Sequence, residues 1–179
     1  MLTLTFRTAT SDDVDALVAL VTSAYRGEAS RAGWTTEADF LDGARIDPDV
    51  LRQDILRPRS LVLVVERDGR LIACAHIAEE DGAGYFGMFS VSPDLQGGGI
   101  GKALLEQAER TVRDEWRLPA MRMTVIDLRE ELIAFYQRRG YRRTGIHKPF
   151  PYGDARFGIP LRDDLRFEVL EKDLSGASA

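Results

Sequence analysis

A run of glycines between two apolar segments is the part of this sequence best suited to bind an anion. Gly97, Gly98, Gly99 and Gly101 follow a strand-like segment that ends at Val91. Because glycine has no Cβ, its amide can approach a ligand closely and adopt backbone angles that other residues resist. The first amides of the following helix point at the same ligand, and the helix dipole favours phosphate there. The run therefore predicts a site for a phosphorylated cofactor.

The spacing of these glycines excludes two common phosphate-binding motifs. A P-loop requires a glycine where this chain has Gln96 and a serine or threonine where it has Ala103. A dinucleotide-binding fingerprint requires a third glycine, but the two registers of the run reach Lys102 or Leu104 at that position. The cofactor is therefore expected to be neither a P-loop nucleotide nor a dinucleotide.

The run does match the pattern Gln-x-x-Gly-x-Gly, formed by Gln96, Gly99 and Gly101 directly after a strand. This pattern resembles motif A of the GNAT family of N-acetyltransferases. The segment Phe135–Tyr141 reads Phe-Tyr-Gln-Arg-Arg-Gly-Tyr and is similar to a second pattern of that family, Tyr-x-x-x-Gly-Phe/Tyr. Two motifs in the right order, about thirty to forty residues apart, are more specific than one glycine cluster. The resemblance extends over most of the chain.

The resemblance implies an α/β (α+β) fold, with a mixed, mostly antiparallel central sheet and helices on both faces. In that fold two strands splay apart, here 85–91 and 121–126, and acetyl-CoA enters the gap. The strand backbone would pair with the pantetheine arm, and the amides of the glycine run would hold the pyrophosphate, with added charge from the lysine. The residues that the resemblance assigns to the cofactor are Phe89, Ser90, Val91, Gln96, Gly97, Gly98, Gly99, Ile100, Gly101, Lys102 and Arg129.

The resemblance also implies a catalytic tyrosine. An amine that attacks a thioester must first be neutral, although lysine-like amines have a pKa of ~10.4. The departing thiolate needs a proton in return. A tyrosine, with a pKa of ~10, stays protonated at neutral pH and can supply it. This general acid maps onto Tyr136, for which the alternative is a packing aromatic residue.

The general base is less well defined, because the strand 85–91 contains no carboxylate where many relatives carry one. Glu79 and Glu80, at the end of the preceding strand, are candidates that would act through water. Asp127, at the end of the strand after the glycine helix, is a third. The alternative for each is a solvated surface acid.

Arg129 stands where relatives often have an asparagine that touches the cofactor arm. An arginine there can reach a CoA phosphate or the substrate. The alternative is a helix-surface arginine that pairs with Glu130 or Glu131.

The remaining pattern predicts the elements that position these residues. Asp68-Gly69 marks a tight hairpin turn. We expect strands at 2–7, 61–65, 71–77, 85–91, 121–126, 141–146 and 167–170. We expect helices after Ser11-Asp12-Asp13, from Asp47-Pro48 with Val50, Leu51 and Ile55 as its apolar side, after Gly101, and over 130–138 with Gly140 as its cap.

Composition places the chain among ordinary globular proteins. It has 179 residues, 44% hydrophobic and 30% charged, with a net charge of -5 and no window of membrane-spanning length. We expect a single N-acetyltransferase domain over 1–174 and a disordered tail over 175–179. The N-terminus lacks a signal-peptide pattern and Cys74 is the lone cysteine, so we expect a cytoplasmic protein. No basic block predicts nucleic-acid binding, and two histidines with one cysteine do not make a metal site.

Two functions are compatible with these features. The first is an acetyl-CoA-dependent N-acetyltransferase that acts on a primary amine by direct attack. The second is an acyl-CoA-binding sensor without significant turnover. The acceptor is open: a polyamine, an amino acid, an aminoglycoside-like compound or a protein N-terminus. An acidic chain favours a cationic amine, and the resemblance allows a homodimer. The residues expected to flank the acceptor are Trp34, Glu37, Arg45, Phe150 and Tyr152.

Overall fold

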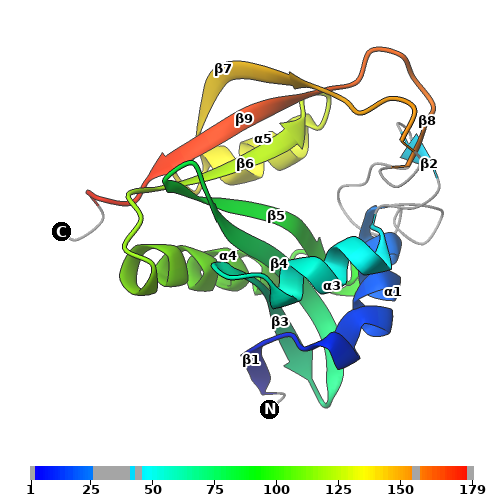
Figure 1. The fold of residues 1–179 in the computed structure, drawn as a ribbon, viewed down its shortest axis with the longest axis vertical. Coiled ribbons are helices and arrows are strands. Elements are labelled where there is room, and N and C mark those ends of the chain that lie inside the picture. Colours follow the sequence, from blue (N-terminus) through cyan, green and yellow to red (C-terminus); the bar gives the residue numbers. More distant parts are fainter. Residues whose placement is uncertain (1–2, 26–40, 43–45, 155–157, 177–179) are drawn as a thin grey trace.

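The computed structural model describes residues 3–25, 41–42, 46–154 and 158–176. Its main sheet has seven strands and a second, small sheet has two (Figure 1). The strands of the main sheet are β1 (Leu4–Thr8), β3 (Ser60–Arg67), β4 (Arg70–Glu80), β5 (Ala83–Val91), β6 (Ala120–Ile126), β7 (Arg142–Pro149) and β9 (Arg166–Asp173). The small sheet pairs β2 (Leu41–Asp42) with β8 (Ile159–Pro160). Among the described residues, the α-helices are α1 (Val14–Tyr25), α3 (Pro48–Leu56), α4 (Ile100–Arg110) and α5 (Glu130–Gln137).

The main sheet is mixed and mostly antiparallel, as predicted. Its order is β1-β3-β4-β5-β6-β9-β7, and only β5 and β6 pair in parallel. The predicted hairpin is confirmed: β3 and β4 meet at Asp68 and Gly69, both with positive φ, as a tight right-twisting turn requires. The predicted closing pair is also confirmed, because β7 pairs with β9.

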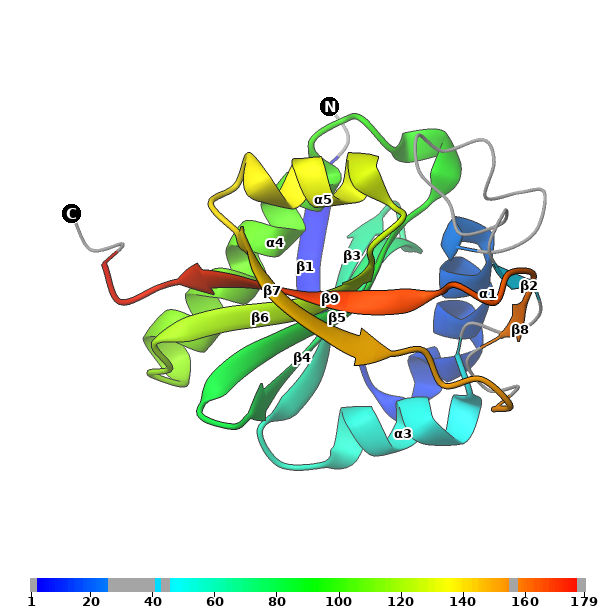
Figure 2. The ribbon, with the colours of Figure 1, turned by 90° about the horizontal axis from the view of Figure 1, so that it is seen from above.

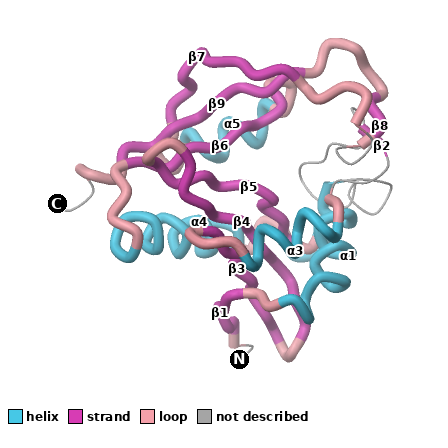
Figure 3. The backbone as a smooth tube through the Cα atoms, in the orientation of Figure 1, coloured by secondary structure: helices cyan, strands magenta, loops and turns pink. Residues whose placement is uncertain are grey.

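Helices cover both faces of the sheet (Figures 2 and 3). On one face, Leu104 and Leu105 of α4 pack into a core that also holds Ile133 of α5. On the other face, Leu17 of α1 and Leu51 of α3 pack into a second core. One prediction about α3 is wrong. Val50 is exposed, because the side of this helix that faces the core is centred on Leu51.

Helix ends follow the predicted capping residues. The Asp47 side chain accepts hydrogen bonds from the amides of Asp49 and Val50 at the start of α3. At the end of α5, Gly140 has φ +97°, and the Tyr141 amide donates to the Tyr136 carbonyl at 3.1 Å. This left-handed cap turns the chain from α5 directly into β7.

The structure describes the first two residues of the predicted tail. Of the tail predicted over 175–179, Ser175 and Gly176 are described, and the Ser175 amide donates to the Asp173 carboxylate at 2.8 Å. Residues 177–179 lie outside the described ranges.

Within the described ranges, no helix combines the length and the apolar character needed to cross a membrane.

Candidate active site

The site begins where β5 separates from β6. The two strands pair only at Gly84 with Met121 and at Tyr85 with Arg122. Beyond those pairs they diverge, so that β1, β3, β4 and β5 form one half of the sheet and β6, β9 and β7 the other (Figure 1). The predicted splayed pair is therefore present. Backbone groups on the facing edges beyond Tyr85 are left for other partners.

A bulge in β5 accompanies this separation. The register against β4 shifts between the pairs Cys74–Ser90 and His76–Gly87. Within the bulge Met88 has φ +54°, a conformation that is costly for a residue with a side chain. The Met88 side chain is buried in the core under α1 and α3, whereas Phe89 packs against the opposite core. The bulge thereby re-aims Phe89 toward α4 and α5.

The glycine run forms the predicted loop and helix start. Gly97 and Gly99 have φ of +88° and +85°, and Gly99 is the N-cap of α4. The Gln96 side chain donates through Nε2 to the Val91 carbonyl at 3.0 Å and so ties the loop to the end of β5. A Cβ at Gly101 would lie 2.8 Å from Cζ of Phe89. The absence of a side chain at this position lets the first turn of α4 lie against that ring.

A cavity of about 400 Å³, which we call the glycine cavity, lies beside this loop. Most of the predicted cofactor residues line it: Phe89, Ser90, Val91, Gln96, Gly97, Gly99, Gly101, Lys102 and Arg129. Gly98 and Ile100 belong to the same loop and helix start but are not part of its lining. The lining residues that sequence reasoning missed are Ala24, Tyr25, Leu95, Leu132, Phe135, Arg138 and Arg139.

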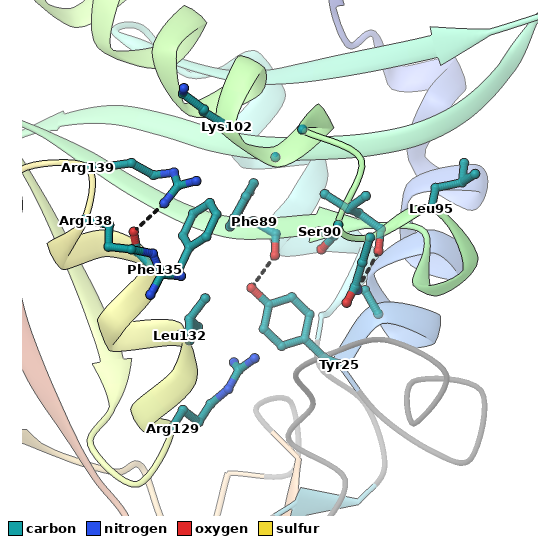
Figure 4. A pocket seen from close by; sticks show the side chains of 16 residues that line it. Tyr25, Phe89, Ser90, Leu95, Lys102, Arg129, Leu132, Phe135, Arg138 and Arg139 are labelled. Carbon is teal, nitrogen blue, oxygen red and sulfur yellow. Dashed lines mark hydrogen bonds between the residues drawn. The ribbon is translucent and has the colours of Figure 1, made fainter.

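Three cations lie toward one end of the glycine cavity. Lys102 comes from α4, and Arg138 and Arg139 follow the end of α5 (Figure 4). Arg139 donates through Nη1 to the Phe135 carbonyl at 3.0 Å, and its guanidinium carbon lies 3.8 Å from the centre of the Phe135 ring. The sequence signal for these two arginines was their position directly after Tyr136 and Gln137 in the second motif.

A second cavity of about 230 Å³ lies between the diverging strands, and we call it the splay cavity. Its lining comes from α1, β5, β6, α5, β9 and the segment after β7, and aromatic rings make up much of it. Four residues line both cavities and form the wall between them: Tyr25, Phe89, Arg129 and Leu132.

Tyr25, at the end of α1, braces this shared wall. Its hydroxyl donates to the Phe89 carbonyl at 2.5 Å, and the guanidinium carbon of Arg129 lies 5.2 Å from the centre of its ring. Figure 4 shows Tyr25 and Arg129 together, at the end of the site away from Lys102. No motif marked Tyr25, because it joins the site through the fold, 64 residues from Phe89 in sequence.

Tyr136 lines the splay cavity and is 3% exposed. Its ring packs against Phe86, Phe89, Phe135 and Tyr141, with centroid distances of 5.5 to 6.4 Å. Tyr141 serves a different purpose, since its hydroxyl donates to Glu109 at 2.9 Å. Burial and the Glu109 carboxylate raise the pKa of Tyr141 far above its ordinary value, so this phenol stays protonated.

The carboxylates considered as bases lie elsewhere. Glu79 pairs with Arg59 at 2.5 Å and lies opposite Gly84, at the other end of β5 from Phe89. Glu80 precedes the turn into β5, and Asp127 pairs with Arg166 at 2.5 Å. None of these carboxylates lines the glycine cavity or the splay cavity.

The acceptor-side predictions are placed in part. Phe150 lines the splay cavity. Tyr152 packs on Phe150 at a centroid distance of 5.1 Å, and its hydroxyl donates to the Arg162 carbonyl and accepts from the Leu165 amide. This clasp holds the segment after β7 against the cavity. The remaining three predictions, Trp34, Glu37 and Arg45, lie outside the described residues.

Comparison with known proteins decides the family. The sequence model of the Acetyltransferase (GNAT) family matches residues 19–141. The chain belongs to this family. It is 31% identical over 134 residues to the S-(2-succino)cysteine N-acetyltransferase of Bacillus subtilis (strain 168), across 70% of this chain and 78% of that protein. The GNAT resemblance drawn from Gln96, Gly99, Gly101 and the second motif is therefore confirmed, and the protein is an acyltransferase.

Solved structures share the fold of this GNAT chain. The ribosomal-protein-S18-alanine N-acetyltransferase from Escherichia coli superposes with a TM-score of 0.70 at 15% identity, over 97% of this chain and 95% of that one. The PaiA N-acetyltransferase from Thermoplasma acidophilum, in complex with coenzyme A, gives a TM-score of 0.69 at 16% identity, over 96% and 99%. At these identities the likeness shows the fold alone, and the predicted fold class is confirmed.

Proposed function

We propose that this GNAT enzyme transfers an acetyl group from acetyl-CoA to a primary amine. The observation that carries the proposal is the arrangement of two cavities on either side of the Phe89 backbone. The glycine cavity takes the cofactor and the splay cavity takes the amine, with Tyr136 in the wall of the latter. The transfer would take place at the shared wall.

The residues of the glycine cavity fit coenzyme A. Glycines with positive φ present a loop without side chains, and the first turn of α4 adds amides that the helix itself does not use. Lys102, Arg138 and Arg139 supply positive charge for the phosphates. The edge of β5 at Phe89, Ser90 and Val91 offers backbone groups to an extended arm. A solved structure with the same fold contains coenzyme A.

When bound, acetyl-CoA supplies the activated acetyl thioester. The carbon–nitrogen bond to the amine forms as the carbon–sulfur bond breaks. Tyr136 holds a proton on its hydroxyl oxygen at neutral pH and gives it to the departing sulfur. The amine loses its surplus proton to water. No carboxylate lines the described walls of the splay cavity. The products are an amide and the free CoA thiol, and Tyr136 regains its proton from solvent.

Replacing Tyr136 with phenylalanine tests this mechanism. Y136F keeps the ring and removes the proton, so kcat is expected to fall about 10²- to 10⁴-fold while the Kd for coenzyme A stays nearly the same. Thiol release measures kcat, and calorimetry measures Kd. Tyr141→Phe is the matched control, because its hydroxyl faces Glu109 rather than a cavity.

The outcomes are distinct. An unchanged kcat in Y136F would exclude Tyr136 as the acid. If acetyl-CoA binds but no amine in a broad panel causes release of the CoA thiol, the result would instead support the acyl-CoA-binding sensor. Equal losses in Y136F and Y141F would show that the effect is not specific to the Tyr136 hydroxyl and would count against Tyr136 as the acid.

A further inference from the structure

The splay cavity carries information about the acceptor that the glycine motif does not. Aromatic and apolar side chains, among them Tyr85, Phe150 and Phe167, form most of its described lining. Within that lining Arg129 is the single residue charged at neutral pH, and no aspartate or glutamate is present. A polyamine or an aminoglycoside would bring several positive charges into this cavity. Its described walls offer those charges no negatively charged side chain. The acidic net charge of the chain is therefore a poor guide to the acceptor.

Arg129 lies at the reacting end of the site rather than at the phosphate end. It is the N-cap of α5, whereas Arg138 and Arg139 follow the other end of the same helix. The eight residues of α5 lie between Arg129 and Arg138, and nine steps along a helix correspond to about 13 Å. Figure 4 shows Lys102 and Arg139 together at one end and Arg129 beside Tyr25 at the other. The charge of Arg129 therefore acts at the wall between the two cavities.

The surroundings of Arg129 suit it to bind a carboxylate. It is 5% exposed and lies 5.2 Å from the centre of the Tyr25 ring, so its position is constrained. A buried guanidinium interacts strongly with an anion because water screens the pair little. It also carries five N–H donors, so a substrate carboxylate can add to the contacts that Arg129 already makes.

A cation at this position also acts on the attacking nitrogen. The carboxylate of an amino acid by itself raises the pKa of its amine, and a guanidinium paired with that carboxylate offsets this effect and so increases the fraction of the neutral nucleophile. This effect is useful in a cavity whose described walls hold no carboxylate base. An α-amino acid satisfies both conditions, because its carboxylate and its amine are attached to the same carbon.

We infer that the acceptor is an α-amino acid with a free carboxylate and an apolar side chain. Arg129 binds the carboxylate, and the rings of Phe150, Phe167 and Tyr85 enclose the side chain. The inference rests on the proposed acetyl transfer and narrows its substrate. It also assigns Arg129 to the acceptor, not to the cofactor phosphates.

The test compares amino acids with their amides, which lack the carboxylate, and with polycations. Thiol release at saturating acetyl-CoA is measured with L-phenylalanine, L-leucine, their amides, spermidine and an aminoglycoside. We expect kcat/KM for each acid to exceed that for its amide roughly 10- to 100-fold. Spermidine and the aminoglycoside should be poorer still. A higher kcat/KM for an amide or a polycation would overturn the inference while the proposed function stood, whereas no release with any acceptor would count against both.

Variants separate the two possible roles of Arg129. R129Q should bring the acid-to-amide ratio close to one, with the Kd for coenzyme A nearly unchanged by calorimetry. R138Q is the matched control, for which we expect the opposite: a higher Kd for coenzyme A and an unchanged ratio. If R129Q instead raises the Kd for coenzyme A tenfold or more and keeps the ratio, Arg129 belongs to the cofactor site and the inference is wrong. Thermal unfolding of each variant checks that the fold is intact.

Discussion

At the scale of single residues, Gly101 shows how little room the first turn of α4 has. A Cβ there would lie 2.8 Å from the Phe89 ring, which is itself enclosed by Phe86, Phe135 and Tyr136. Gly98 lies in the same loop, but its nearest neighbour would be the Leu95 carbonyl at 3.6 Å. The two positions therefore differ in space, although both read as glycines of one motif.

We predict that Gly101→Ala weakens coenzyme A binding and lowers stability. Overpacking against Phe89 costs about 1–3 kcal/mol, and the helix propensity of alanine offsets at most about 1 kcal/mol of it. The Kd for coenzyme A, measured by calorimetry, should rise, and the Tm should fall by several degrees. Gly98→Ala is the control and should change Tm little. Equal changes of Tm and Kd in the two variants would show that the contact between Gly101 and Phe89 does not determine stability or coenzyme A binding.

Some residues of the site belong to local sequence motifs, and others join the site only through tertiary packing. Gly99, Gly101 and Tyr136 belong to local motifs, and each of them lines one of the two cavities. Tyr25 and Leu132 join the wall only through tertiary packing, which no local pattern encodes. Glu79 illustrates the converse: it is near the glycine run along the chain, yet its strand carries it to the far end of β5.

At the scale of elements, the strands and helices were largely predictable, but the bulge in β5 was not. Alternation and the turn at Asp68-Gly69 specify the β3–β4 hairpin locally. The positive φ of Met88 has no such signal, because methionine does not favour it and burial in the second core enforces it. The bulge that accompanies the splay thus depends on tertiary packing.

A partly buried ion pair joins α4 to β9 and also engages Tyr141, which precedes β7. Glu109 of α4 accepts from Lys172 of β9 at 3.0 Å and from the Tyr141 hydroxyl at 2.9 Å. Lys172→Met keeps the apolar stem and removes the ammonium, so a buried carboxylate loses one partner. We predict a loss of about 1–3 kcal/mol in the free energy of unfolding, measured with urea.

A double variant provides the control for this prediction. In Glu109→Gln with Lys172→Met, the neutral amide still accepts from Tyr141 and no buried charge is left without its partner. The double variant should therefore be more stable than Lys172→Met alone. If it is less stable, the loss in Lys172→Met does not come from a carboxylate left without its ammonium partner.

At the scale of the whole molecule, the two helical faces depend differently on protons. Under α3, His76 is buried, with its Nε2 2.8 Å from the Ser60 hydroxyl. Burial lowers its pKa from the ordinary value of 6.5, the Asp54 carboxylate opposes this shift, and Arg57 adds to it. On the opposite face, Arg143 pairs with the buried Glu168 and holds the pKa of that carboxyl below its ordinary 4.5.

Stability is therefore predicted to fall in two stages as the pH decreases. Below pH 6.5 the unfolded chain protonates His76, whereas the folded protein does so only at a lower pH. The unfolded state therefore binds more protons, and the free energy of unfolding decreases. Below 4.5 the same reasoning applies to Glu168. Urea unfolding from pH 8 to 3 measures both stages. His76→Gln should flatten the upper stage. Glu168→Gln should reduce the lower stage in part, because the pKa values of Asp13 and Glu171 are also lowered in the folded protein. An upper stage that persists in His76→Gln would place its origin in another group.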